Sequence, residues 1–252
     1  MIFETYIPGE GMTEAGKAIA AMMEGVNEGR SYADMMRLRI SGGVSDQCND
    51  TYFVAREGEE CLSRLWHGWG KHENAIGNFG NFLTREDLQG QGIGKQMMAL
   101  WQQTIDAEPN KPLGLFCSSK ERPAQMYFRY GFRPALKGKS YGPLYLPLGN
   151  SPETFQEFCD MYYQPTKKLI ARTATIEWRH EIDLLLKFAL LDRGIKFGIG
   201  GFTVIEEALL YAPGKAEQIF TEEGLCVGWR VGEETQLYPL YEGLEIVTEH
   251  AG

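Results

Sequence analysis

The fold is decided in one stretch, TREDLQGQGIGK, which occupies residues 84–95. It follows an apolar run and leads into a segment in which mostly apolar residues share one helical face, at Ile93, Met97, Met98, Leu100, Trp101, Thr104 and Ile105. The pattern predicts a strand, a glycine-rich turn and a helix. Unbonded backbone N–H groups and the positive end of the helix dipole would meet at one point, which favours a bound phosphate or pyrophosphate.

Two well-known glycine-rich motifs do not fit this stretch. A P-loop requires Ser or Thr where Gln96 stands, and in a Rossmann fingerprint the last glycine comes later than Gly94 does here. The spacing that fits is Gln89-x-x-Gly92-x-Gly94. The alternative is a surface turn that only caps an amphipathic helix.

Composition sets the broad class of protein. The chain has 252 residues, of which 43% are hydrophobic, and this is enough for one large domain or two small ones. No apolar run approaches the length of a membrane span, and the first residues lack the pattern of a signal peptide. The five cysteines are scattered and the four histidines have no ligand spacing, so we expect reduced thiols, a cytoplasmic location and no metal site.

Charge is distributed unevenly along the chain. Residues 1–150 contain 16 basic and 17 acidic residues, whereas residues 151–252 contain 9 and 17, so the net charges are −1 and −8. An acidic protein of this kind is a poor nucleic-acid binder, and we expect neither a nucleic-acid nor a membrane partner. The acidic second part favours a cationic small-molecule substrate, or it is simply a soluble surface.

Read in order, residues 1–150 alternate between β-rich runs and helical patterns. We expect a strand within 1–8, a helix over 13–24, a helix or strand over 32–40, strands over 51–55, 62–69 and 75–84, a helix from Gly92, a strand over 113–117, a helix ending at Gly131, and strands near 132 and 144–146. The short turns among the middle strands indicate an antiparallel meander. Gly77 and Gly80 indicate a bulge or a close ligand approach in the last of these strands.

A second motif, YFRYGF at residues 127–132, lies downstream of the glycine-rich turn. Together with Gln89-x-x-Gly92-x-Gly94 and the order of elements, it resembles the core of the GNAT acetyltransferase superfamily. The resemblance implies an α+β fold, with a mixed, mostly antiparallel sheet flanked by helices over residues 1–150. Two positions depart from the family pattern, Glu86 in place of the usual proline and Lys120 in place of a common Asn.

The resemblance also implies acetyl-coenzyme A as co-substrate and gives roles to particular residues. The turn would bind the coenzyme pyrophosphate through the backbone, and the preceding strand end would pair with the pantetheine amides or polarise the thioester carbonyl. Tyr127 would protonate the leaving thiolate, or else it is a core aromatic. The residues implied to bind the coenzyme are Phe82, Leu83, Thr84, Gln89, Gly90, Gln91, Gly92, Ile93, Gly94, Lys95 and Lys120.

A general base is not identified by the sequence. Glu73, His67 and His72 precede the site and are candidates, although each has an ordinary role in a turn or in the core. Cys117 lies in an apolar strand, where a cysteine usually packs.

Residues 151–252 form a C-terminal α+β extension in this interpretation. We expect helices over 152–163 and 177–191, mixed helical and β signals over 202–211, and strands over 219–221, 225–231 and 236–241. The extension could close over the acceptor pocket, form a homodimer, or add strands to the first sheet. The functional hypothesis is direct acetyl transfer to an amine of a small molecule, and the alternative is a non-catalytic acyl-coenzyme A-binding regulatory module.

Overall fold

The computed structural model of the chain describes residues 1–24, 30–198 and 202–249. Its larger sheet has the spatial order β1-β2-β3-β4-β5-β7-β6 and is antiparallel except where β4 meets β5. The strands of this sheet are β1 (Ile2–Tyr6), β2 (Cys48–Glu57), β3 (Glu60–Gly70), β4 (Gly77–Thr84), β5 (Gly114–Ser119), β6 (Arg133–Pro134) and β7 (Gly142–Pro147). The expected fold class and the antiparallel meander of β2, β3 and β4 are confirmed.

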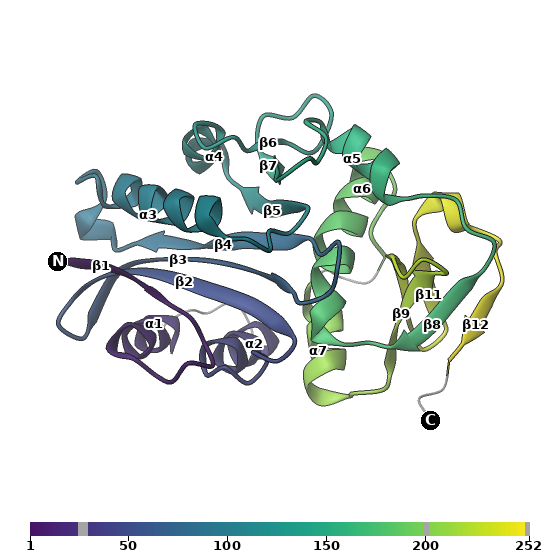
Figure 1. Cartoon of the computed structure of the whole chain (residues 1–252), viewed down its shortest axis with the longest axis horizontal. Helices are drawn as coiled ribbons and strands as arrows, with labels where there is room; N and C mark the ends of the chain where they lie inside the picture. Colours follow the sequence, from purple (N-terminus) through teal and green to yellow (C-terminus); the bar gives the residue numbers. More distant parts are fainter. Residues whose placement is uncertain (25–29, 199–201, 250–252) are drawn as a thin grey trace.

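Helices cover both faces of the larger sheet (Figure 1). One face carries α1 (Glu14–Glu24) and α2 (Arg30–Ile40), and the other carries α3 (Ile93–Ala107) and α4 (Glu121–Phe128), with the short 3-10 helix η1 (Glu86–Leu88) before α3. Thr13 begins α1 as expected, because its hydroxyl accepts a hydrogen bond from the Gly16 N–H. The segment that sequence left undecided between helix and strand is α2.

The extension builds a second sheet with the order β11-β10-β9-β8-β12. Its elements are α5 (Phe155–Tyr162), β8 (Leu169–Thr173), η2 (Ile176–Trp178), the π-helical segment η3 (Glu181–Leu186), α6 (Lys187–Asp192), α7 (Phe202–Tyr211), β9 (Ala216–Thr221), β10 (Cys226–Val231), β11 (Glu234–Leu237), η4 (Pro239–Tyr241) and β12 (Ile246–Thr248). In the described residues no strand of this sheet pairs with the larger sheet, so that expected role is wrong.

Three further expectations for the extension need correction. The helix expected over 177–191 is divided into η2, η3 and α6, because the fully buried segment Glu181–Leu186 has the wider turn of a π-helix. The strand expected over 236–241 ends at Leu237, and Pro239 starts a 3-10 turn. β8 and β12 were not expected, and β12 pairs with β8 in parallel.

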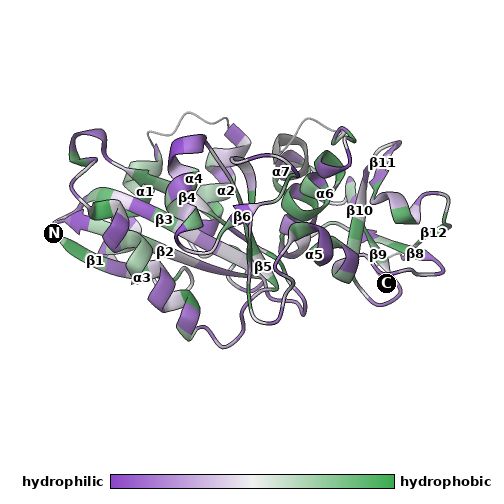
Figure 2. Cartoon of the chain, turned by 90° about the horizontal axis from the view of Figure 1, so that it is seen from above, coloured by the Kyte–Doolittle hydropathy of each residue, from purple (hydrophilic) through white to green (hydrophobic). Residues whose placement is uncertain are grey.

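The helices of the extension lie between the two sheets (Figures 1 and 2). The largest apolar cluster joins Phe116 and Tyr145 of the larger sheet to Phe158, Leu185 and Ile219 of the extension, so one core crosses the boundary between them. Two smaller clusters pack α3 and α4 on one face of the larger sheet and α1 and α2 on the other. No helix among the described residues is both long enough and apolar enough to cross a membrane.

Candidate active site

The strands β4 and β5 separate after a short parallel pairing. The two strands pair in parallel only at Gly77 with Leu115 and at Asn78 with Phe116, after which β5 continues along β7. Among the described residues, the edge of β4 that faces β5 therefore has no strand partner beyond Asn78, so a ligand can pair with its backbone groups. From the sequence we expect the strand end at Phe82, Leu83 and Thr84 to pair with a ligand through its backbone, and such pairing needs an open strand edge.

The turn after β4 is shaped by two glycines in the left-handed conformation. Gly90 has φ 81° and Gly92, the residue that begins α3, has φ 83°. A Cβ placed at either position would meet no heavy atom within 4 Å, so the backbone here is open to an approaching group. The first N–H groups of α3 precede its first hydrogen bonds, which Lys95 and Gln96 donate to the Gly92 carbonyl. The local geometry suits an anion.

Side-chain contacts hold the turn against the end of β4. Arg85 donates to both carboxylate oxygens of Asp87, at 2.6 and 2.8 Å. Gln89 Nε2 donates to the Thr84 carbonyl at 3.2 Å, and Gln91 Nε2 donates to the Asp87 carbonyl at 3.2 Å. These contacts keep the two glutamines close to the backbone, so their amides support the shape of the turn.

A cavity of about 410 Å³, which we call the cleft, lies between this turn, the end of β4 and α4. Eight residues expected at the site line it, namely Phe82, Leu83, Thr84, Gln89, Gly90, Ile93, Gly94 and Tyr127. Gln91, Gly92, Lys95 and Lys120 do not line it, and Lys120 is an exposed residue at the start of α4.

The cavity is also lined by Leu88, Pro123 and Met126, which sequence reasoning missed, and by Arg122. From the sequence, Arg122 is one of a cluster of basic residues that are either solvated or partners of the coenzyme phosphates. Arg122, Pro123 and Met126 lie in α4 together with Tyr127. Residues four apart, such as 122 with 126 and 123 with 127, are neighbours on the helix surface. Tracing that helix face from Tyr127 would have found them. Arg122 gives the cavity a cationic side chain that can face an anionic group.

Tyr127 is buried at the wall of the cavity, with 8% of its surface exposed. Its ring meets Phe79 edge to face at 5.3 Å and lies stacked 6.4 Å from Phe82. Burial raises the pKa of the Tyr127 hydroxyl above its usual value of about 10. The hydroxyl is therefore held in its protonated form, in which it can donate a hydrogen bond.

None of the three candidate bases lines this cavity. His67 is in the core, where its Nδ1 accepts a hydrogen bond from Trp101 Nε1 at 3.1 Å, and burial lowers its pKa to about 3. His72 and Glu73 line a different cavity of about 650 Å³, at the turn between β3 and β4. Cys117 is buried in β5, and burial raises the pKa of its thiol.

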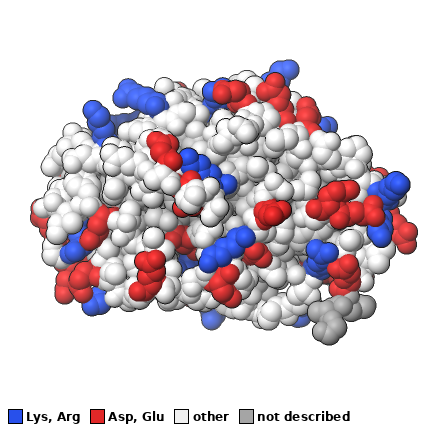
Figure 3. All heavy atoms as spheres, in the orientation of Figure 1, with Lys and Arg blue, Asp and Glu red and all other residues white. Residues whose placement is uncertain are grey.

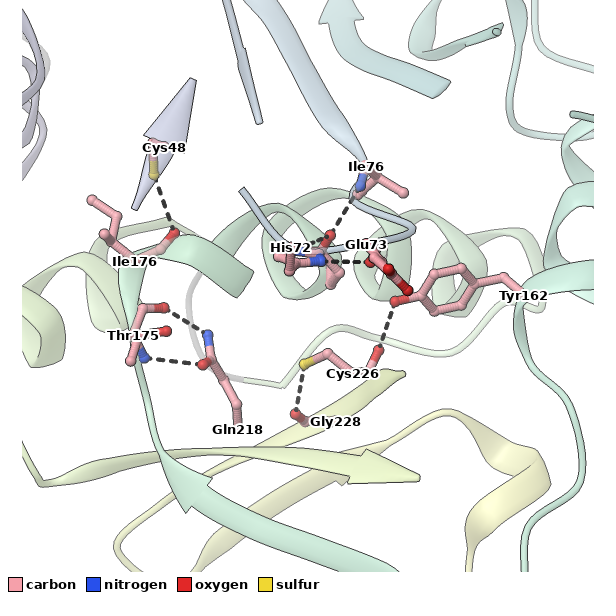
Figure 4. A network of polar contacts seen from close by, with 11 residues as sticks. Cys48, His72, Glu73, Ile76, Tyr162, Thr175, Ile176, Gln218, Cys226 and Gly228 are labelled. Carbon is pink, nitrogen blue, oxygen red and sulfur yellow. Dashed lines mark hydrogen bonds and ion pairs between the residues drawn. The ribbon is translucent and has the colours of Figure 1, made fainter. Parts of the chain in front are cut away.

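His72 instead joins the larger sheet to the extension (Figure 4). Its Nε2 lies 3.3 Å from Glu181 Oε1, which also accepts a hydrogen bond from the Ile76 N–H at 3.0 Å, and its ring stacks on Trp178 at 3.3 Å. Burial alone would lower the pKa of His72, but the Glu181 carboxylate raises it above its usual value. The contacts of His72 with Glu181 and Trp178 give this histidine a structural role.

Charged groups elsewhere do not define a second centre. Among residues 1–24, 30–198 and 202–249, no group of three or more His, Cys, Asp or Glu side chains could hold a metal ion, and His250 lies outside the described residues. Acidic and basic side chains are interspersed over the face drawn in Figure 3.

The fold and the cleft together define the class of protein: an α+β domain whose sheet opens beside a glycine-rich turn with a geometry that suits an anion. Residues 48–134 match the family model described as an acetyltransferase (GNAT) domain. This match spans about a third of the chain and contains β2, the cleft, α3, α4 and Tyr127. Residues 48–134 are thus similar to the acetyltransferase domains of the GNAT superfamily.

Solved structures that resemble this chain cover a little over half of it. An acyl-CoA N-acyltransferase from Pseudomonas aeruginosa is 14% identical over 57% of this chain and 98% of its own, with a TM-score of 0.42. Escherichia coli ElaA is 14% identical over 57% of this chain and 97% of its own, with a TM-score of 0.43. At these values neither similarity bears on the substrate. A comparison with curated proteins found no match.

Proposed function

We propose that this protein transfers the acetyl group of acetyl-coenzyme A directly to an amine of a small molecule. The observation that carries the proposal is the cleft itself. It combines an unpaired strand edge, an open glycine turn at a helix start and a buried tyrosine hydroxyl in one continuous wall. These are the three features that a nucleotide-linked thioester requires: amide partners, an anion site and a group near the sulfur.

The coenzyme would lie along the cleft with its pyrophosphate at the turn. The N–H groups around Gly92 and Gly94 would donate to the phosphate oxygens, with Arg122 as a cationic partner. The pantetheine arm would follow the open edge of β4 and pair with its backbone as an added strand does. This direction of entry would bring the thioester toward Phe82 and Tyr127.

The chemistry is acyl transfer within a ternary complex. The amine nitrogen, in its neutral form, would attack the thioester carbonyl carbon, so that a C–N bond forms and the C–S bond breaks. A backbone N–H on the edge of β4 would stabilise the charge that develops on the carbonyl oxygen. The proton lost by the amine balances the proton gained by the sulfur, so the products are an acetamide and the free thiol of coenzyme A.

Tyr127 would act at the leaving sulfur. Because burial raises its pKa above that of a thiol, which is about 8.5, complete proton transfer from the phenol is uphill. Its contribution would be a hydrogen bond that strengthens as negative charge develops on sulfur, followed by exchange of the proton with the one released from the amine. In this proposal a hydrogen bond to the sulfur replaces the direct protonation of the thiolate that is expected of Tyr127 from the sequence.

The acceptor class is proposed from charge. Residues 151–252 carry a net charge of −8, and an acidic surface raises the local concentration of a cationic small molecule. Polyamines, aminoglycosides and amino acids are the compounds to examine first. A cationic amine would have to lose its proton before attack, which predicts that turnover rises with pH.

Release of free coenzyme A thiol over a panel of such amines tests the proposal. We expect amine-dependent release, and we expect Tyr127→Phe to lower kcat by about 100-fold while the KM for acetyl-coenzyme A stays within about threefold. Tyr130→Phe is the matched control, because Tyr130 is on the same chain segment but does not line the cavity. Release that does not depend on the amine would contradict the proposal, and full turnover by Tyr127→Phe would remove Tyr127 from its role at the leaving sulfur.

A further inference from the structure

β4 contains a bulge beside the cleft. Its pairing with β3 runs from Gly80 opposite Trp66 to Leu83 opposite Arg64, so two residues of β4, Asn81 and Phe82, face a single residue of β3. Such a bulge changes the direction of the strand and redirects its backbone groups. The sequence prediction of a bulge near Gly80 is confirmed.

Asn81 has a backbone conformation that residues with a Cβ seldom adopt. Its φ is 52°, and among the described residues the only other non-glycine residue with positive φ is Asn74, at φ 58°. Asparagine tolerates this left-handed region better than most residues, but the conformation persists only where the surroundings hold it. The contacts of its side chain therefore bear on the geometry of the bulge.

Those contacts come from α2, on the face of the sheet opposite Tyr127. The Tyr32 hydroxyl donates a hydrogen bond to Asn81 Oδ1, and Asn81 Nδ2 lies 3.5 Å from Met36 Sδ. On the other face the ring of Phe82, the second bulge residue, stacks with Tyr127. The bulge is thus contacted from both sides, by α2 through Asn81 and by α4 through Phe82.

The bulge lies where a thioester would meet the strand. Pairing between β4 and β5 has ended at Asn78, and Phe82 lines the cleft. Donors that stabilise charge in a transition state must be positioned closely, and a displacement of about 1 Å can reduce the rate by about 100-fold. A loose bulge would therefore lower turnover without removing the binding site.

We infer that Tyr32 and Asn81 are positioning residues, which act through each other to fix the β4 bulge for acyl transfer. The inference rests on the proposed function. Neither side chain needs to touch the coenzyme or the acceptor. The hydrogen bond from α2 holds the left-handed turn at Asn81, and the turn sets the direction of the backbone at Phe82.

Two variants separate this role from a purely structural one. Asn81→Gly removes the carboxamide and accepts positive φ without strain, so the fold is preserved. Tyr32→Phe removes only the hydroxyl. Asn74→Gly is the matched control, because it changes the other left-handed asparagine, which lies in the turn before β4 and outside the cleft.

The readouts are acetyl-coenzyme A turnover, followed as thiol release, and amide hydrogen exchange of the peptide covering residues 79–84. We expect both variants to lower kcat by at least about tenfold with the KM for acetyl-coenzyme A unchanged within about twofold, and the double variant to be no slower than either single one. Exchange at residues 79–84 should be faster in both variants. Asn74→Gly should behave as the wild type does.

The inference is overturned if Asn81→Gly and Tyr32→Phe match Asn74→Gly in kcat and in exchange, or if their effects add in the double variant. Failure of the proposed function looks different: the wild type would then bind no acetyl-coenzyme A in a calorimetric titration. In that case unchanged exchange at residues 79–84 in Tyr32→Phe would separately overturn the claim that Tyr32 holds the bulge.

Discussion

The cleft and the contact surface between the two sheets are built in different ways. The cleft takes its residues from two short segments, 82–94 and 122–127, which a motif can describe. The contact surface joins residues more than a hundred positions apart, such as Ile76 with Glu181 and Cys48 with Ile176. Local sequence therefore specifies the candidate binding site, whereas packing between distant segments specifies the contact surface that supports it.

Glycines show the same difference at atomic scale. A Cβ at Gly70 would lie 2.1 Å from the Glu177 carbonyl oxygen, so this glycine allows η2 to approach β3 closely. A Cβ at Gly94 would lie 3.5 Å from the Phe82 ring, which is an ordinary contact. One glycine is required by the folded protein itself, and the other leaves room that a ligand can use.

The largest expected effect is on folding, from Gly70→Ala. The new methyl group would meet backbone, which cannot move aside as a side chain can, and we expect a loss of about 3 kcal/mol or more in the free energy of unfolding. Gly94→Ala is the control, and its effect should stay within about 1 kcal/mol. Urea unfolding of both variants measures the difference. Equal stabilities would show that the approach of η2 to β3 is not tight.

A smaller effect is expected from pH at the same surface. Because Glu181 raises the pKa of His72 in the folded protein, protonated His72 stabilises the fold. This stabilisation is complete below the ordinary histidine pKa of about 6.5 and is lost as pH rises through the raised value. The melting temperature of the wild type, relative to that of His72→Gln, should fall by a few degrees between about pH 5.5 and pH 8.5.

Parallel melting curves for the two proteins across this pH range would remove His72 as the source of the effect. Glu73→Gln is a suitable control, because Glu73 is exposed in the same turn and makes no ion pair in the described structure. Its melting temperature should follow that of the wild type across the range.

Much of the first 150 residues could be predicted because their signals are local. The spacing from Gln89 to Gly94 identified the turn, and Gly131 marks the end of the α4 region with φ 89°, as a left-handed glycine after a helix should. The domain boundary expected near residue 150, where the sequence pattern changes, stays a prediction. One apolar core crosses this position.

Other features depend on contacts that no local pattern contains. Arg179 donates to both Asp183 and Glu206, and all three side chains are buried in the extension, although the sequence shows only charged positions there. Burial raises the pKa of Asp183, and the cationic Arg179 opposes that shift. The place of Arg122 at the cleft likewise depends on how α4 packs on the sheet.

The central claim is that the turn before α3 holds the diphosphate of acetyl-coenzyme A, and calorimetric titration of two charge variants tests it most directly. Gly94→Glu and Gln96→Glu each add one negative charge to the first turns of α3, but only residue 94 lines the cavity. We predict that Gly94→Glu weakens binding by about 100-fold or more, while Gln96→Glu stays within about threefold of the wild type. Equal affinities for the two variants, with both proteins folded, would contradict the claim.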